Sequence, residues 1–140
     1  MRRLALIPLL LLLAGCEHNR STSGARADID PGAGIDERCK VEIVDGSLKS
    51  SLKVEGALSR MENGFLVVEV KVRNKTGRNL PCEWMTTFRD KDGFDMRVTS
   101  NPWSPVVLNS NQTEPLSKTA PAPGAEKAVF YIREAAPIRK

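Results

Sequence analysis

The sequence predicts an all-β domain, an immunoglobulin-like antiparallel β-sandwich of about seven strands. Two observations lead to this fold class. No stretch of helical length places its apolar residues at helical spacing. Short segments that alternate apolar and polar residues recur instead, separated by turn residues at intervals of about 8–12 residues. The composition, 41% hydrophobic and 27% charged, excludes a collagen, a coiled coil and a wholly disordered chain.

The expected extended segments follow one another along the chain, with turn residues between them. Asn63 and Gly64 form the strongest hairpin signal in the sequence. Gly46 and the Asp-rich stretch ending at Gly93 mark further turns. The expected segments are residues 40–44, 48–58, 65–72, 81–90, 94–98, 106–108, 114–119 and 127–134.

Alternation within these segments predicts which side chains form the core. The clearest pattern lies at residues 65–72, where every second residue is a branched aliphatic and Glu69 and Lys71 fall on the other face. The predicted inward positions are Leu52, Val54 and Leu58; Leu66, Val68, Val70 and Val72; Cys82, Trp84, Thr86 and Phe88; and Ala128, Phe130 and Ile132.

Residues 1–16 have the build of a bacterial lipoprotein signal peptide. Arg2 and Arg3 give a positive start, and the apolar run at 4–14 is shorter than the roughly 20 residues that span a membrane. The tetrapeptide ending in Cys16 resembles the lipobox, in which the cysteine is lipidated and becomes the first mature residue. The alternative is a plain cleaved signal that contains a cysteine. The expected organisation is a signal peptide at 1–15, lipidated Cys16 with a flexible tether at 16–37, and a β-sandwich at 38–136.

The lipobox resemblance implies a lipid-anchored protein that faces the periplasm. Three acyl chains would anchor it permanently, whereas one chain binds a membrane only marginally. Glu17 stands where Asp is the usual signal for inner-membrane retention, so the outer membrane is expected. Without Arg2 and Arg3, 19 basic residues face 17 acidic ones, and they are scattered along the chain. A nucleic-acid partner is therefore not expected.

The three cysteines divide into one lipid attachment and one pair. In an oxidising compartment the default for Cys39 and Cys82 is a disulfide, worth roughly 4 kcal/mol for a loop of this length. Two buried free thiols are the alternative. A redox pair would have Cys-x-x-Cys spacing, and a structural zinc site would have four ligands, and the sequence offers neither.

Few residues are candidates for catalysis or metal binding, and no cofactor is expected. The only histidine is His18 in the tether, so a Ser-His or Cys-His site has no base. Asp90, Asp92 and Gly93 resemble the start of a calcium loop but lack its later ligands, which favours a hairpin turn. Unclustered methionines are more typical of core gap-filling than of a copper site; they are Met61, Met85 and Met96.

Two segments are candidates for partner binding. Trp103 stands between Pro102 and Pro105 in an expected loop, where an exposed aromatic anchor would suit a protein interface. The second is the loop at residues 74–79, with Asn74 and Arg78 as its candidate contact residues.

The order of these features resembles the YcfL-like family of small periplasmic lipoproteins. The resemblance covers roughly residues 50–134, and rests on LVVEVKVRN at 66–74, CEWMTTFRD at 82–90 and VFYIR at 129–133. This chain has Cys82-Glu83-Trp84 and Phe88-Arg89-Asp90 where the family is richer in Tyr and Trp. The resemblance implies an immunoglobulin-like sandwich without assigned enzymatic activity, in a setting of peptidoglycan-related envelope assembly. It carries over no catalytic residue.

The expected function is therefore that of a non-enzymatic, outer-membrane-anchored module that binds a protein partner in the envelope. A small-ligand or metal carrier is the main alternative and would need a pocket in the sandwich. An enzyme acting on peptidoglycan or lipid is a third possibility, with only ordinary Ser, Lys and Asp residues to carry it.

Overall fold

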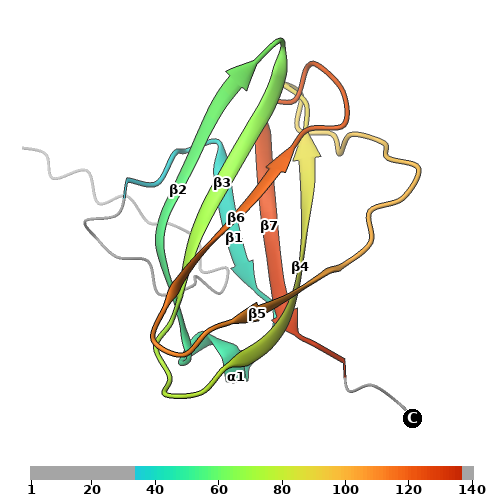
Figure 1. Cartoon of the computed structure of the whole chain (residues 1–140). Helices are drawn as coiled ribbons and strands as arrows, with labels where there is room; N and C mark the ends of the chain where they lie inside the picture. Colours follow the sequence, from blue (N-terminus) through green and yellow to red (C-terminus); the bar gives the residue numbers. More distant parts are fainter. Residues whose placement is uncertain (1–33, 137–140) are drawn as a thin grey trace, which may run out of the picture.

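The computed structural model describes residues 34–136 and confirms the all-β fold, with seven strands in two sheets (Figure 1). The expected signal peptide and residues 16–33 of the expected tether lie outside the described residues. The strands are β1 (Cys39–Ile43), β2 (Leu52–Glu62), β3 (Phe65–Asn74), β4 (Leu80–Arg89), β5 (Ser104–Leu108), β6 (Thr113–Thr119) and β7 (Lys127–Glu134), and one helical turn, α1 (Gly46–Lys49), separates β1 from β2.

The two sheets differ in width. One has four strands in the order β1-β7-β4-β5, and the other has three in the order β2-β3-β6. Neighbouring strands are antiparallel except for β1 and β7, which run parallel. The parallel pair departs from the expected antiparallel sandwich. It is possible because most of the domain lies between the two strands, and a parallel pair needs a long connection.

The core lies between the sheets and contains all the side chains that alternation predicted except Leu58. The inward row of β3 is completely buried, and the row on β7 is exposed by 1% or less. Trp84 on β4 stacks on Phe130 of β7, with ring centroids 5.6 Å apart and planes 11° from parallel. Because apolar burial is the main favourable term in folding, these two rows supply much of the stability.

A bulge in β2 changes the expected core at one position. The pairing register of β2 with β3 shifts between Val54 and Gly56. The extra residue reverses the alternation, because side chains on a strand have a period of two. Ala57 is therefore buried, while Leu58, expected in the core, is 54% exposed.

Residues 48–51 and 94–98, which were expected to be extended, are not strands. Leu48 lies in α1, where it is buried, and β2 begins only at Leu52. Residues 94–98 begin a hairpin with β4, since the N–H of Met96 donates to the carbonyl of Phe88 at 2.7 Å. The pairing then stops, because the next carbonyl on this edge of β4, that of Thr86, accepts a hydrogen bond from the side-chain amide of Asn101 at 2.9 Å. Phe94 is left 71% exposed.

Residues 34–38 form part of the fold, although residues up to 37 were expected in the tether. Ile35 forms a parallel bridge with Ala57 on β2, and the N–H of Asp36 donates to the Ala57 carbonyl at 2.8 Å. Two residues later, the carbonyl of Arg38 accepts a hydrogen bond from the N–H of Ala128 on β7 at 2.8 Å. The segment therefore passes from one sheet to the other and closes this side of the sandwich.

The Asp36 carboxylate fixes this crossing. Its hydrogen bonds from the Arg38 side chain, with a further one from the Ser59 hydroxyl, lower the pKa of Asp36 to about 2. A lowered folded-state pKa means that the carboxylate stabilises the fold at neutral pH. This contribution is lost as the pH falls from the unfolded-state value toward 2.

The expected disulfide is contradicted: Cys39 and Cys82 are free and buried. In the pairing register, Cys39 lies beside Ala128 at one end of β7, and Cys82 lies beside Glu134 at the other. That offset is about 20 Å along the strand, and β7 also lies between the two strands that carry the cysteines. A disulfide needs Cα atoms within about 7 Å, so the two buried thiols of the alternative are present instead.

Both thiols should be present and unreactive in the folded protein. Burial, with the nearby Asp36 carboxylate, raises the pKa of Cys39 to about 12. Burial, with Glu134 and Asp45, raises the pKa of Cys82 to about 11. In the Cys16→Ser chain, purified without reductant, Ellman titration should find two thiols after denaturation and almost none in the native state. If neither thiol is found after denaturation, Cys39 and Cys82 form a disulfide after all.

Candidate partner-binding site

The candidate site lies on the outer face of the four-stranded sheet. Glu83 and Met85 on β4, and Tyr131 and Arg133 on β7, alternate with buried residues and therefore point away from the core. The strand register pairs Glu83 with Arg133, and Met85 with Tyr131. Trp103 reaches this face from the loop that precedes β5. We call these five residues the outer-face cluster.

Trp103 and Glu83 hold the Arg133 guanidinium between them. The guanidinium carbon lies 3.9 Å from the centroid of the Trp103 ring. Nε and Nη2 of Arg133 donate to the same Glu83 carboxylate oxygen, Oε2, at 2.9 and 2.7 Å. A cation over an aromatic face contributes about 0.5–1 kcal/mol at an exposed site. The contacts therefore fix the orientation of the Trp103 ring more than they stabilise the fold.

The cluster has the composition of a protein interface. Aromatic residues, Met and Arg are the types enriched where proteins bind one another. All five members are half-buried, so each still presents surface to solvent. Beside them on β5, Val107 is 53% exposed. Ion pairs border the same sheet face, with Lys40 and Glu42 2.7 Å apart and Arg89 and Asp95 2.8 Å apart.

The structure places the three predicted partner-binding residues in different surroundings. Trp103 belongs to the outer-face cluster. Arg78 is exposed in the loop between β3 and β4 and is not a member of that cluster. Asn74 is 0% exposed, so its assignment to partner binding was wrong.

Asn74 organises the loop between β3 and β4 instead. Its side-chain Nδ2 donates to the carbonyls of Arg78 at 2.7 Å and of Leu108, on β5, at 2.9 Å. Its Oδ1 accepts from the N–H and the hydroxyl of Thr76. Every hydrogen-bonding position of the amide is therefore used, and the loop is tied to both sheets.

Sequence reasoning missed four members of the cluster: Glu83, Met85, Tyr131 and Arg133. The available signal was that opposite charges and large side chains alternate with core residues on two separate strands. That signal becomes informative only once the strand register is known, because a shift of one residue would move each side chain to the other face.

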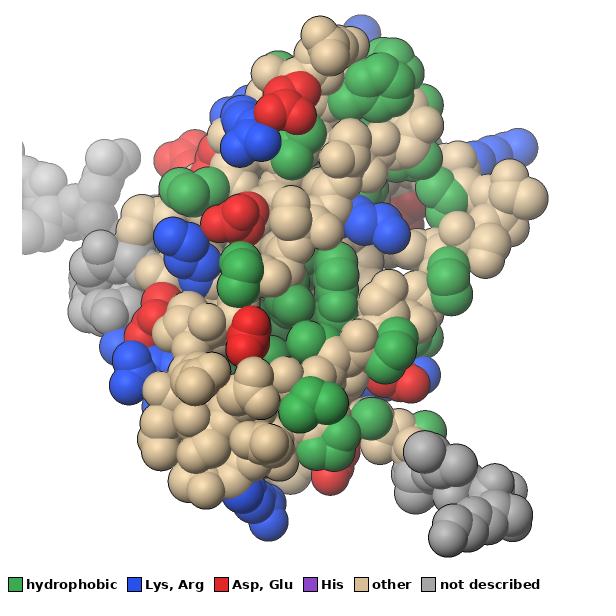
Figure 2. Space-filling view, viewed as in Figure 1, with side chains coloured by type: hydrophobic (Ala, Val, Ile, Leu, Met, Phe, Trp, Pro, Cys, Tyr) green, Lys and Arg blue, Asp and Glu red, His purple; other side chains and the backbone are tan. Residues whose placement is uncertain are grey.

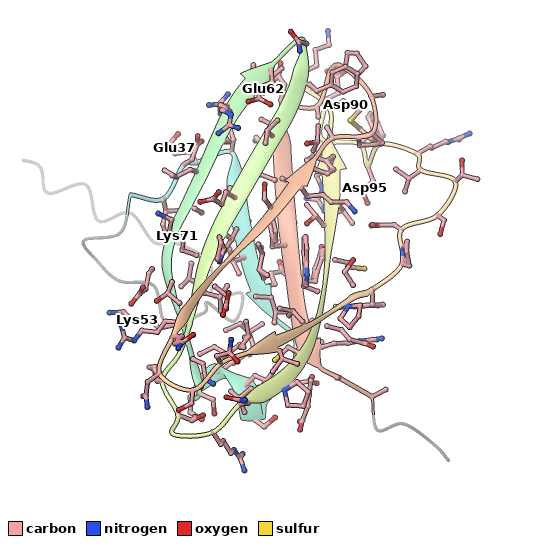
Figure 3. All side chains as sticks on the ribbon, in the orientation of Figure 1. Glu37, Lys53, Glu62, Lys71, Asp90 and Asp95 are labelled. Atoms are coloured by element: carbon pink, nitrogen blue, oxygen red, sulfur yellow. The ribbon has the colours of Figure 1, made fainter. Side chains whose placement is uncertain are left out.

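The calcium and metal alternatives gain no support from the described residues. Asp90 Oδ1 accepts hydrogen bonds from the N–H groups of Asp92 and Phe94, both at 3.0 Å, and Gly93 has a φ of +87°. These are features of a tight turn. Asp95, labelled with Asp90 in Figure 3, bridges to Arg89 and pairs with its side chain at 2.8 Å. Residues 34–136 contain no group of three metal-binding side chains.

Comparison with known protein families shows to which family this chain belongs. The family described as a protein of unknown function, DUF1425, matches residues 40–134, which is most of the chain. The chain belongs to the DUF1425 family. No curated protein matches it significantly.

Solved structures share the fold. A DUF1425 family member from Shewanella sp. pv-4 has a TM-score of 0.55 and 20% sequence identity, covering 61% of this chain and 78% of its own. Campylobacter jejuni cj0090 has a TM-score of 0.58 and 22% identity, covering 71% of this chain and all of its own. At these identities the likeness concerns the fold alone.

Replacing Asn74 tests its structural role. Asn74→Ala should lower the free energy of unfolding by about 2 kcal/mol or more, because the buried carbonyl of Leu108 loses its partner and the part-buried contacts of the amide with Arg78 and Thr76 are lost with it. The measurement is urea unfolding followed by tryptophan fluorescence.

Asn79→Ala in the same loop is the matched control. The Asn79 side chain accepts one exposed hydrogen bond, from the N–H of Ser110 at 2.9 Å. Its removal should therefore cost less than about 1 kcal/mol. Equal losses from the two variants would contradict the structural role of Asn74.

Proposed function

We propose that this protein is an outer-membrane lipoprotein that faces the periplasm and binds a protein partner, without enzymatic activity, during peptidoglycan-related assembly of the cell envelope. The outer-face cluster carries the proposal, because it presents an oriented Trp103 among residue types that dominate interface energies. The resemblance of residues 50–134 to YcfL-like lipoproteins supports the envelope setting.

Anchoring through Cys16 rests on the sequence motif. The positive start, the short apolar run and the lipobox-like tetrapeptide agree with one another. No helix within residues 34–136 is long and apolar enough to cross a membrane. A lipid on Cys16 would hold the domain close to the membrane, since a flexible chain spans only about 5–6 Å × √n on average.

Few groups of this chain are suited to catalysis. The only histidine of the chain, His18, precedes the described domain. Both thiols of the domain are buried with raised pKa values, so they are poor nucleophiles at neutral pH. Contact with a partner protein therefore explains the oriented side chains of Trp103 and Arg133 better than catalysis does.

Photo-crosslinking in living cells tests this function. Benzoylphenylalanine in place of Trp103 or Tyr131 should trap the same envelope protein, identified by mass spectrometry. The same probe at Lys71 should not, because Lys71 lies on the three-stranded sheet (Figure 3). Combining the Trp103 probe with Cys16→Ser should lower the yield at least about tenfold, because loss of the anchor lowers the effective concentration.

Two results would count against the proposal. One is the same set of products from Trp103, Tyr131 and Lys71, which would indicate unspecific contact. The other is no product from either outer-face position, or only a second copy of the chain.

A further inference from the structure

The core is closed on one side of the sandwich and open on the other. Inward side chains on β1 and β7 are exposed by 8% or less, and the crossing segment at residues 34–38 covers their side. On the opposite side, Trp84, Val106 and Met96 pack against the core but are only partly buried. Their remaining exposure shows that no strand covers this part of the core.

The opening is a wedge between the free edges of β5 and β6. Figure 1 shows the two strands diverging from the turn that connects them, at residues 109–112. The Asn74 loop ties down the narrow end, through its bond to Leu108. In Figure 2, apolar side chains are visible in the hollow between β6 and β5.

The free edge of β6 carries backbone groups suited to another strand. The N–H of Asn74 donates to Gln112, and the N–H of Ala120 donates to Leu66, so even-numbered residues of this stretch face β3. Backbone groups of odd-numbered residues therefore point into the wedge. Pro115 occupies one of these positions, where it sacrifices no pairing with β3. Ser117 and Thr119 retain both an N–H and a carbonyl there.

Side chains beside this edge indicate what would fit. Leu116 and Lys118 pair with inward residues of β3, so they lie on the core side of β6. Lys118 has no ion-pair partner among residues 34–136. Deeper in the core, on β4, the hydroxyl of Thr86 is buried and unpartnered, and the residue is only 3% exposed.

We propose that the wedge receives an extended segment of a partner protein, which pairs with β6 as a fourth strand of the narrower sheet. An added strand lies about 4.8 Å from β6, and its alternate side chains point inward. Apolar residues at those positions cover Trp84, Val106 and Met96. An acidic residue beside Lys118 neutralises its charge.

Two other occupants fit less well. Ile35, at the start of the described residues, bridges to β2, at the edge of the three-stranded sheet opposite β6. A second copy pairing through β6 would bring two Lys118 side chains near one another, and like charges on neighbouring strands repel. This site is separate from the outer-face cluster, because Trp84 and Trp103 lie on opposite faces of the sheet.

The test begins with the full chain in detergent micelles and a phage-displayed random peptide library as the probe. Selected peptides should alternate apolar and polar residues and carry Asp or Glu. Their binding should slow hydrogen exchange at the N–H groups of Ser117 and Thr119. Selection of no peptide, or protection confined to other residues, would overturn the proposal.

Two variants of one residue separate backbone pairing from side-chain contact. Ser117→Pro removes an N–H that faces the wedge and should weaken binding at least about tenfold. Ser117→Ala keeps that N–H and should bind as the unaltered chain does. Lys118→Glu should shift selection toward peptides with Lys or Arg. Equal binding by Ser117→Pro would contradict the proposal. If that variant does not fold, the hydrogen-exchange measurement on the unaltered chain still tests the proposal.

Hydrogen exchange of the chain without added peptide tests the two other occupants, a second copy and the chain's own segment. Protection of Ser117 and Thr119 that rises with protein concentration would indicate a second copy. Protection that disappears when residues 17–33 are deleted would indicate the chain's own segment. Either result would overturn the proposal. The Trp103 crosslink should persist in Ser117→Pro, so failure of strand addition and failure of the proposed function are distinguishable.

Discussion

The domain depends on the packing of one alternating row of side chains on β3 against the matching row on β7. No covalent link supports this core, because the two cysteines of the domain lie near opposite ends of β7. Other features attach to its margins. The Asp36 crossing fastens one side, and the Asn74 amide fastens the loop at one end. The sandwich is therefore held by burial and by a few fully used polar groups.

The unequal width of the sheets turns this core into two different surfaces. The wider sheet has an outer face on which Trp103 and Glu83 orient Arg133, and this face is independent of the core's interior. The narrower sheet leaves part of the interior open beside β6, where Trp84 and Val106 are only partly covered. A partner can engage the first as a rigid surface and the second by adding backbone hydrogen bonds. One packing arrangement thus offers two modes of recognition.

Strand positions were largely predictable from alternation, since burial of one strand face imposes a period of two on the sequence. The exceptions arise from long-range contacts. The bulge before Gly56 exposes Leu58, and the Asn101 amide replaces the pairing expected for residues 94–98. Strand register was also hidden, so the sequence indicated neither the separation of Cys39 from Cys82 nor the Glu83–Arg133 pair. Trp103 could be proposed because prolines flank it, whereas Asn74 in a loop gave no sign of its burial.

Urea unfolding with and without reductant tests most directly whether the packed core holds the sandwich without a disulfide. The Cys16→Ser chain, purified under oxidising conditions, avoids interference from the lipid-attachment thiol. The midpoint and the denaturant dependence should be the same in both conditions, because reduction has no bond to break. A reductant-induced loss of roughly 4 kcal/mol, the amount expected for a disulfide closing this loop, would contradict the claim.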